Sequence, residues 1–144
     1  MLLAEIGSDM SRFPSAGHLA AWAGLAPGQD ESAGKRRSGK TRRGDPWLRS
    51  GLVAAARGAV RTKDCALTAQ YRRIAARRGD KRAIIAVAHS ILVIVYHVLT
   101  QRQPYHEEGA DYLQRRNPDA QAQRLRAQIE KLGYTVTLAP RAAA

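Results

Sequence analysis

Residues 83–99 read AIIAVAHSILVIVYHVL, a run that is apolar except for two histidines, a serine and a tyrosine. The run is about as long as the shortest membrane spans, but its polar residues and the basic segments before it suit a water-soluble domain. A helix of this composition is apolar on nearly every side, which is typical of a helix buried in a protein core. We therefore expect a central core helix over Lys81–Thr100 and no membrane partner.

Amphipathic segments lie on both sides of this helix in the chain. The Asp45-Pro46 pair is a typical helix start, because Asp caps the first turn and Pro has a helical φ. The expected helices before the central one span residues 15–23, 45–62 and 66–78, and those after it span 110–116 and 117–132. The composition is rich in alanine and aliphatic residues, with 6% aromatic residues, which favours helices over a sheet. We predict an all-α fold of five or six helices packed around the central one.

A single domain is expected, because 144 residues are enough to bury a core. Residues 1–12 resemble the end of an upstream helix, with Leu2, Leu3 and Ile6 on one face and a stop at Gly7. We expect them to be a remnant of upstream sequence, residues 13–138 to form the helical domain, and residues 139–144 to be a disordered tail. Residues 134–138 alternate in polarity, which predicts a short strand or an extended tail.

Positive charge is concentrated in one third of the chain. The chain has 24 Lys and Arg against 12 Asp and Glu, a net charge of +12. Between Lys35 and Arg82 there are 16 basic and three acidic residues, whereas the rest holds 8 basic and 9 acidic residues. Solubility alone would spread the charge more evenly, so a nucleic-acid phosphate backbone is the simplest partner. The alternative is a solvated basic face without a partner.

The segment 28–44, GQDESAGKRRSGKTRRG, is the most basic part. Its four glycines and lack of apolar periodicity predict an exposed basic Gly/Ser-rich loop that orders on binding a polyanion. Ser32, Ser38 and Thr41 lie among its cations. A serine can attack phosphorus once the phosphate charge is neutralised, and guanidinium groups do this well. Such loops are more often phosphate binders without chemistry, so the residues alone favour binding over catalysis.

Other candidate residues give weaker signals. Cys65 is the only cysteine, which excludes an internal disulfide and, with no basic signal-peptide region at Met1, fits the cytoplasm. His89 and His97 share a helix face, but their apolar surroundings favour core or interface histidines over metal ligands. The scattered acids predict no metal site in this chain. Trp22 is expected to pack against neighbours, whereas Trp47 could pack or stack on bases.

Several stretches of the chain resemble a known family. They are FPSAGHLAAWAGLAPG (13–28), ESAGKRRSGKTRRGDPWLR (31–49), AVAHSIL (86–92) and GADYL (109–113). Together they resemble the C-terminal domain of the DEDD-type insertion-sequence transposases. These are bridge-RNA-guided serine recombinases related to the pilin-gene invertases, and the resemblance covers nearly the whole chain.

The resemblance implies a mechanism and partners. Family members use an N-terminal domain resembling Holliday-junction resolvases, whose four acids bind magnesium, together with a C-terminal serine that forms a phosphoserine link to DNA. Matching their Ser-Gly-Gly-Lys-like motif to Ser32–Lys35 places the nucleophile at Ser32, with Ser38 second. The residues implied to hold the nucleic-acid backbone are Lys35, Arg36, Arg37, Lys40, Arg42, Arg43, Arg49 and Arg57. DNA, a guide RNA and further copies of the full-length protein are the implied partners.

The four-acid domain has no counterpart in these residues. We therefore expect no cofactor in this chain and magnesium in the missing N-terminal domain. The expected function is the DNA-binding and serine-nucleophile domain of an insertion-sequence transposase, incomplete alone, from a truncated or remnant reading frame or a fragment. The alternative is a non-catalytic nucleic-acid-binding helical protein.

Overall fold

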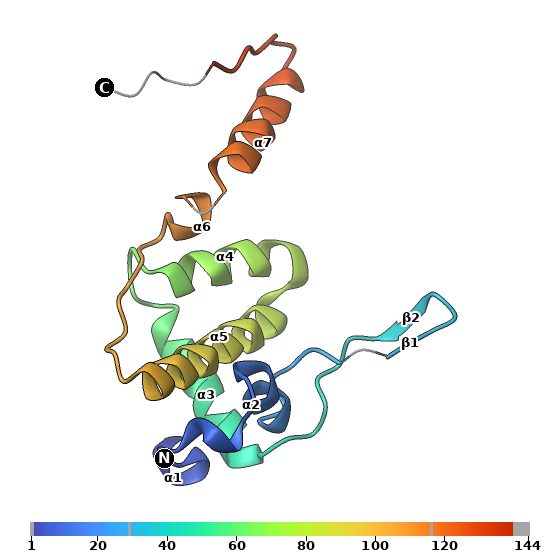
Figure 1. Cartoon of the computed structure of the whole chain (residues 1–144). Coiled ribbons are helices and arrows are strands. Elements are labelled where there is room, and N and C mark those ends of the chain that lie inside the picture. The colour runs from blue at the N-terminus through green and yellow to red at the C-terminus, as the bar shows by residue number, and fades with distance from the viewer. Residues whose placement is uncertain (1, 29, 116, 140–144) are drawn as a thin grey trace. The chain divides into compact units, whose positions relative to one another are not determined.

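The computed structural model describes residues 2–28, 30–115 and 117–139 (Figure 1). It divides into two compact units, Met1–Ala110 and Asp111–Ala144. The elements of the first unit are α1 (Leu2–Ile6), the 3-10 helix η1 (Met10–Arg12), α2 (Ala16–Trp22), β1 (Asp30–Ser32), β2 (Lys35–Ser38), α3 (Pro46–Ala59), α4 (Ala66–Arg78) and α5 (Asp80–Gln101). Those of the second unit are α6 (Tyr112–Arg115) and α7 (Pro118–Glu130). The all-α prediction is confirmed, with helix bounds correct to within about one turn.

The side chains of their own N-cap residues cap the starts of α2, α3 and α7. The Ser15 hydroxyl accepts a hydrogen bond from the His18 N–H at the start of α2. The Asp45 carboxylate accepts one from the Leu48 N–H, at 2.7 Å, at the start of α3. The Asn117 side chain accepts one from the Ala120 N–H at the start of α7. Each bond satisfies a backbone N–H that a helix start leaves without a partner, which is worth about 1 kcal/mol.

The predicted central position of α5 is confirmed. This helix packs against α2, α3 and α4 and buries Ala83, Ile84, Val87, Ala88 and Leu92. The facing helices contribute buried leucines, among them Leu19, Leu48 and Leu52. Alanines at the contacts let the helix backbones approach closely, while the leucines fill the space between them. The result is one contiguous core for the first unit.

By length and composition alone, α5 could also cross a membrane. It has 22 residues, and the mean hydropathy of its most apolar window is 2.1. The core helix of a water-soluble protein meets the same criterion, and α5 packs against three helices, although only 28% of that window is buried.

Residues 2–12 contribute to the same core. Ile6 is 1% exposed and Met10 is 5% exposed, and both belong to the buried cluster that surrounds α5. The predicted tail at 139–144 lies outside the described residues except for Ala139.

In the second unit, α7 exposes its apolar face. Leu125 and Ile129 of α7 are 47% and 41% exposed, Leu132 just after the helix is 75% exposed, and no described residue of α7 is buried. Residues 134–139 form no helix or strand, which fits the extended tail and not the strand.

Candidate nucleic-acid interface

The sequence predicts an exposed loop over residues 28–44, whereas β1 and β2 form an antiparallel hairpin within this basic segment. Ala33 and Gly34, with φ of 51° and 73°, make the two-residue turn. Such turns need a positive φ at both central residues and are usually signalled by Asn-Gly or Asp-Gly between alternating apolar residues. Here the strands are polar and the turn is Ala-Gly, so the usual signal is missing. Figure 1 shows the hairpin extended away from the helices of its unit.

Ser32 lies at the end of β1, next to the turn, where it pairs with Lys35 of β2. Residues directly opposite each other in an antiparallel pair project from the same face, about 5 Å apart at Cβ. Both side chains are exposed. The hairpin thus places a hydroxyl and an ammonium group side by side on one accessible face.

Ser38, the second candidate, lies in a different environment. It is half-buried, and its hydroxyl accepts a hydrogen bond of 3.2 Å from the Lys40 N–H. In the described part of the chain, no residue forms a hydrogen bond with the Ser32 hydroxyl. Ser38 therefore stabilises the end of β2, whereas Ser32 remains accessible to a ligand.

The two ends of the basic segment meet backbone to backbone at Gly24 and Gly44. A Cβ added at Gly24 would lie 2.7 Å from the Gly44 nitrogen and 2.9 Å from the Arg42 carbonyl oxygen. A Cβ at Gly44 would collide with the backbone of Ala23 and Gly24. Gly24 also has a φ of 68°, which few residues other than glycine adopt. Glycine at both positions therefore closes the base of the hairpin.

Arg49 strengthens this closure from α3. Its Nη1 donates hydrogen bonds to the Gly24 carbonyl at 3.0 Å and to the Arg42 carbonyl at 3.4 Å. The side chain is half-buried. A guanidinium has five N–H donors, so these bonds do not test the prediction that Arg49 contacts a phosphate. They give it a role that the sequence did not reveal, which is to hold the basic segment to the helices.

The other predicted cations divide into two groups. Lys35, Lys40, Arg42 and Arg43 are exposed on or beside the hairpin, and Arg57 is exposed on α3. The side chains of Arg36 and Arg37 lie outside the described residues.

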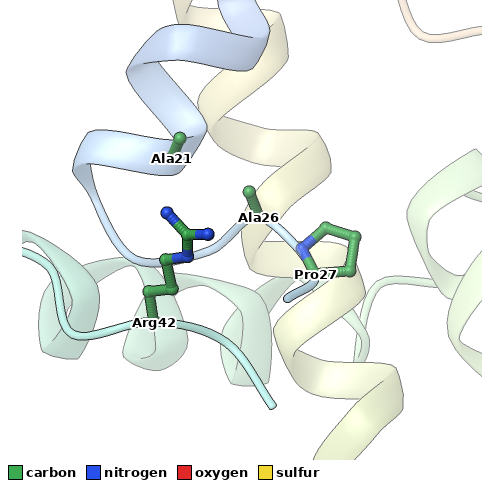
Figure 2. Close-up of a pocket in the computed structure, with 4 residues that line it drawn as sticks. All are labelled: Ala21, Ala26, Pro27 and Arg42. Carbon is green, nitrogen blue, oxygen red and sulfur yellow. The ribbon is translucent and has the colours of Figure 1, made fainter. Parts of the chain in front are cut away.

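Arg42 also lines a pocket of about 180 Å³ with Ala21, Ala26 and Pro27. Figure 2 shows its side chain extending toward Ala21 and Ala26. This volume is below that of typical small-molecule sites, so the pocket suits no sizeable ligand.

The two tryptophans differ in exposure. Trp22 is 43% exposed and its ring packs against Phe13, with centroids 5.7 Å apart. Trp47 is 73% exposed in the first turn of α3, close in sequence to the basic segment. Trp47 is therefore the more accessible of the two rings for stacking on a base.

The two histidines of α5 differ in their environment: His89 is half-buried, as predicted for a packed histidine, whereas His97 is not a core residue. Burial lowers the pKa of His89, so the neutral ring is favoured. His97 is exposed and its ring meets Tyr96 edge-on. Within residues 2–28, 30–115 and 117–139, no three His, Cys, Asp or Glu side chains are grouped so as to hold a metal ion. The described part of the chain therefore does not fit the magnesium site that the resemblance implies for the full-length family.

Glu107 forms a cluster that sequence reasoning missed. Its carboxylate accepts hydrogen bonds from the backbone N–H groups of Ala66 and Gly109, both at 2.9 Å. It also accepts bonds from the Cys65 thiol at 3.2 Å and the Tyr105 hydroxyl at 3.0 Å. Partial burial would raise the pKa of Glu107, but these bonds outweigh it and lower that pKa to about 2. Glu107 therefore caps the start of α4 from forty residues away, and only the tertiary fold reveals this.

Comparisons with known proteins agree on a family. A sequence model of the transposase IS116/IS110/IS902 family matches residues 1–72, which include the hairpin and α3. The chain is also 30% identical over 107 residues to a protein of Pseudomonas aeruginosa described as a probable family 20 transposase. That alignment covers 72% of this chain and 32% of the relative, so the chain spans about a third of the relative's length. No solved structure matches the chain.

Proposed function

The chain belongs to the transposase IS116/IS110/IS902 family, and we propose that it is the part of an insertion-sequence transposase that contacts DNA and supplies a serine nucleophile. The observation that carries this proposal is the exposed hairpin on which Ser32 lies opposite Lys35. This hairpin lies within the residues that match the family.

In the proposed reaction, the Ser32 hydroxyl oxygen attacks the phosphorus of a DNA phosphodiester. The Ser32 hydroxyl loses its proton as its oxygen forms a bond to phosphorus, the bond from phosphorus to one deoxyribose oxygen breaks, and that oxygen takes up a proton, so no net proton is gained or lost. Negative charge builds on the phosphoryl oxygens in the transition state, so a nearby cation lowers the barrier. Lys35 is the cation that the strand pairing brings to the face of Ser32.

The remaining cations would hold the DNA backbone. A two-stranded ribbon fits the major groove of duplex DNA, and Arg and Lys bind phosphates without reading sequence. We assign this contact to Lys35, Arg36, Arg37, Lys40, Arg42, Arg43 and Arg57. Arg49 supports it from the base of the hairpin, through its bonds to Gly24 and Arg42.

Other parts of the activity belong to the full-length transposase in this proposal. The described residues fit no metal ion, so the magnesium expected for the family would be held by a four-acid domain outside this chain. A guide RNA, self-association and a cytoplasmic location are likewise part of the proposal.

A covalent-adduct assay tests the nucleophile. The chain, fused to or mixed with the four-acid domain of a full-length relative, is incubated with DNA and magnesium, and protein-linked DNA is detected on a denaturing gel. Mass spectrometry then locates the linked peptide. We expect the adduct to vanish in Ser32→Ala and to persist in Ser38→Ala, the matched control. An adduct that persists in Ser32→Ala would sink the assignment.

The second candidate is a non-catalytic nucleic-acid-binding protein, favoured by the lack of a grouped metal site in the described residues. It predicts no adduct under any condition. It also predicts that Ser32→Ala leaves DNA binding unchanged, whereas replacing Lys35, Lys40, Arg42 and Arg43 by Gln weakens binding and flattens its salt dependence.

A further inference from the structure

The end of α4 and the start of α5 carry a second group of cations, remote in sequence from the hairpin. The helix α4 has four arginines and no acidic residue, and α5 continues with two more cations after Asp80. We call these six residues the α4–α5 basic surface: Arg72, Arg73, Arg77, Arg78, Lys81 and Arg82. They make up 6 of the 16 basic residues between Lys35 and Arg82.

All six side chains are exposed. Across the described residues, no hydrogen bond or ion pair joins any of them to another side chain or to the backbone. Asp80, the acid in their midst, instead accepts a hydrogen bond of 2.8 Å from the Tyr71 hydroxyl. The positive charges of this surface are therefore available to a ligand.

Helix stability does not account for this arrangement. Cations in the last turn of a helix favour it, which explains Arg77 and Arg78. Lys81 and Arg82 lie in the first turn of α5, where the helix dipole opposes positive charge. Arg73 and Arg77 are four residues apart in α4 and repel each other by a few tenths of a kcal/mol. A surface that served only solubility would carry acidic residues among the basic ones.

The chemistry of the surface fits a phosphate backbone. At about 100° per residue, Arg73 and Arg77 share one face of α4, with Arg72 and Arg78 on its two flanks, and the four span about 9 Å of helix. Duplex DNA carries one charge about every 1.7 Å of its axis. Guanidinium groups bind phosphate oxygens with two parallel hydrogen bonds. We propose that the α4–α5 basic surface is a second binding surface for the phosphate backbone of a nucleic-acid duplex, independent of the hairpin and of any chemistry at Ser32.

A salt titration tests this proposal on the whole chain. The variant R72Q/R73Q/R77Q/R78Q is compared with a matched control, R12Q/R102Q/R124Q/K131Q, which loses the same charge at exposed cations outside this surface. Fluorescence anisotropy gives the Kd for a DNA duplex and for an RNA duplex of equal length at several salt concentrations. We expect the slope of log K against log salt to fall by about 0.9 for each lost phosphate contact, and so by about 2 to 4 units in all. The control variant should keep the slope of the unmodified chain.

The two duplexes distinguish the sources of phosphate. A loss confined to the DNA duplex assigns the surface to DNA, and a loss confined to the RNA duplex assigns it to RNA. The conservative variant R72K/R73K/R77K/R78K, which keeps the charge, should retain most of the slope, and circular dichroism of the glutamine variant checks that its loss of binding is not due to misfolding. Equal slopes for the glutamine variant and its matched control would overturn the proposal. The hairpin variant K35Q/K40Q/R42Q/R43Q reports separately on the proposed function.

Discussion

At the scale of single residues, one carboxylate ties the segment after α5 to the start of α4. Glu107 takes the capping role at a helix start whose own N-cap, Cys65, forms no side-chain capping bond. The Ala66 N–H would otherwise lack a protein partner at this position. The bond to the Cys65 thiol also fixes a side chain that is only 7% exposed.

This cluster predicts an acid-dependent loss of stability. The pKa of Glu107 is depressed in the folded chain, to about 2 from an ordinary 4.5. Its contribution to stability is therefore complete above about pH 4.5 and is lost as the pH falls toward 2. Glu107→Gln should cost about 1 kcal/mol at neutral pH, as the loss of a helix cap does. Thermal melts followed by circular dichroism measure both effects.

The pH series supplies the control for this prediction. Between pH 4.5 and 2 the unmodified chain should lose more stability than Glu107→Gln, so their melting curves should converge. Melting temperatures that fall in parallel for both proteins would show that Glu107 makes no such contribution.

The contact between Gly24 and Gly44 makes a second prediction at this scale. Gly44→Ala forces a methyl group into the backbone of Ala23 and Gly24, so we expect a loss of about 1–3 kcal/mol in the free energy of unfolding. Gly58→Ala is the matched control, because its Cβ would meet nothing within 4 Å on the exposed side of α3. That change should stabilise the chain by about 0.5–1 kcal/mol. Urea unfolding measures both free energies. An equal effect of the two substitutions would contradict the close backbone contact between Gly24 and Gly44.

At the scale of elements, the hairpin is a local structure whose turn requires two positive φ angles. Gly34→Val places a β-branched residue at a φ of 73° and should disrupt the pairing of Ser32 with Lys35. Since none of the strand side chains that the structure describes belongs to the buried core cluster, the melting temperature should change by only a few degrees while DNA affinity falls. Ala33→Gly suits the same turn and should keep the affinity. Equal affinities for both variants would show that hairpin geometry does not matter for binding.

The helices could be predicted from sequence because their signals are local. The cap at Asp45, the apolar stripe of α3 and the continuous apolar surface of α5 each lie within one segment. The hairpin could not, because its strands bury no apolar face and so show no alternation. The structural roles of Arg49 and Glu107 were missed for a different reason. Their partners lie 25 and 41 residues away along the chain. The sequence alone does not show that residues so far apart in the chain are in contact.

At the scale of the whole molecule, the core of the first unit is self-contained. Among the side chains that the structure describes, the buried members of the hydrophobic cluster lie between Ile6 and Leu92, and the Glu107 cap closes before residue 110. A chain ending at Ala110 should therefore unfold cooperatively at nearly the same temperature as the full chain. Calorimetry measures this unfolding transition. The control is Leu125→Gln in the full chain, which changes an exposed residue of α7 and should leave the transition of the first unit unchanged. A truncated chain without a cooperative transition would contradict the division into units.

The closed base of the hairpin has a consequence for how this protein can vary. Because Gly24 and Gly44 meet directly, residues 25–43 form one excursion from the helices, and both of its ends are fixed. The entropy of closing such an excursion changes by only about 0.6 kcal/mol when its length doubles. The tip of this segment can therefore change in length or sequence at a small cost in stability. Such a change would alter which ligand the segment binds while the packing of the helices stays the same.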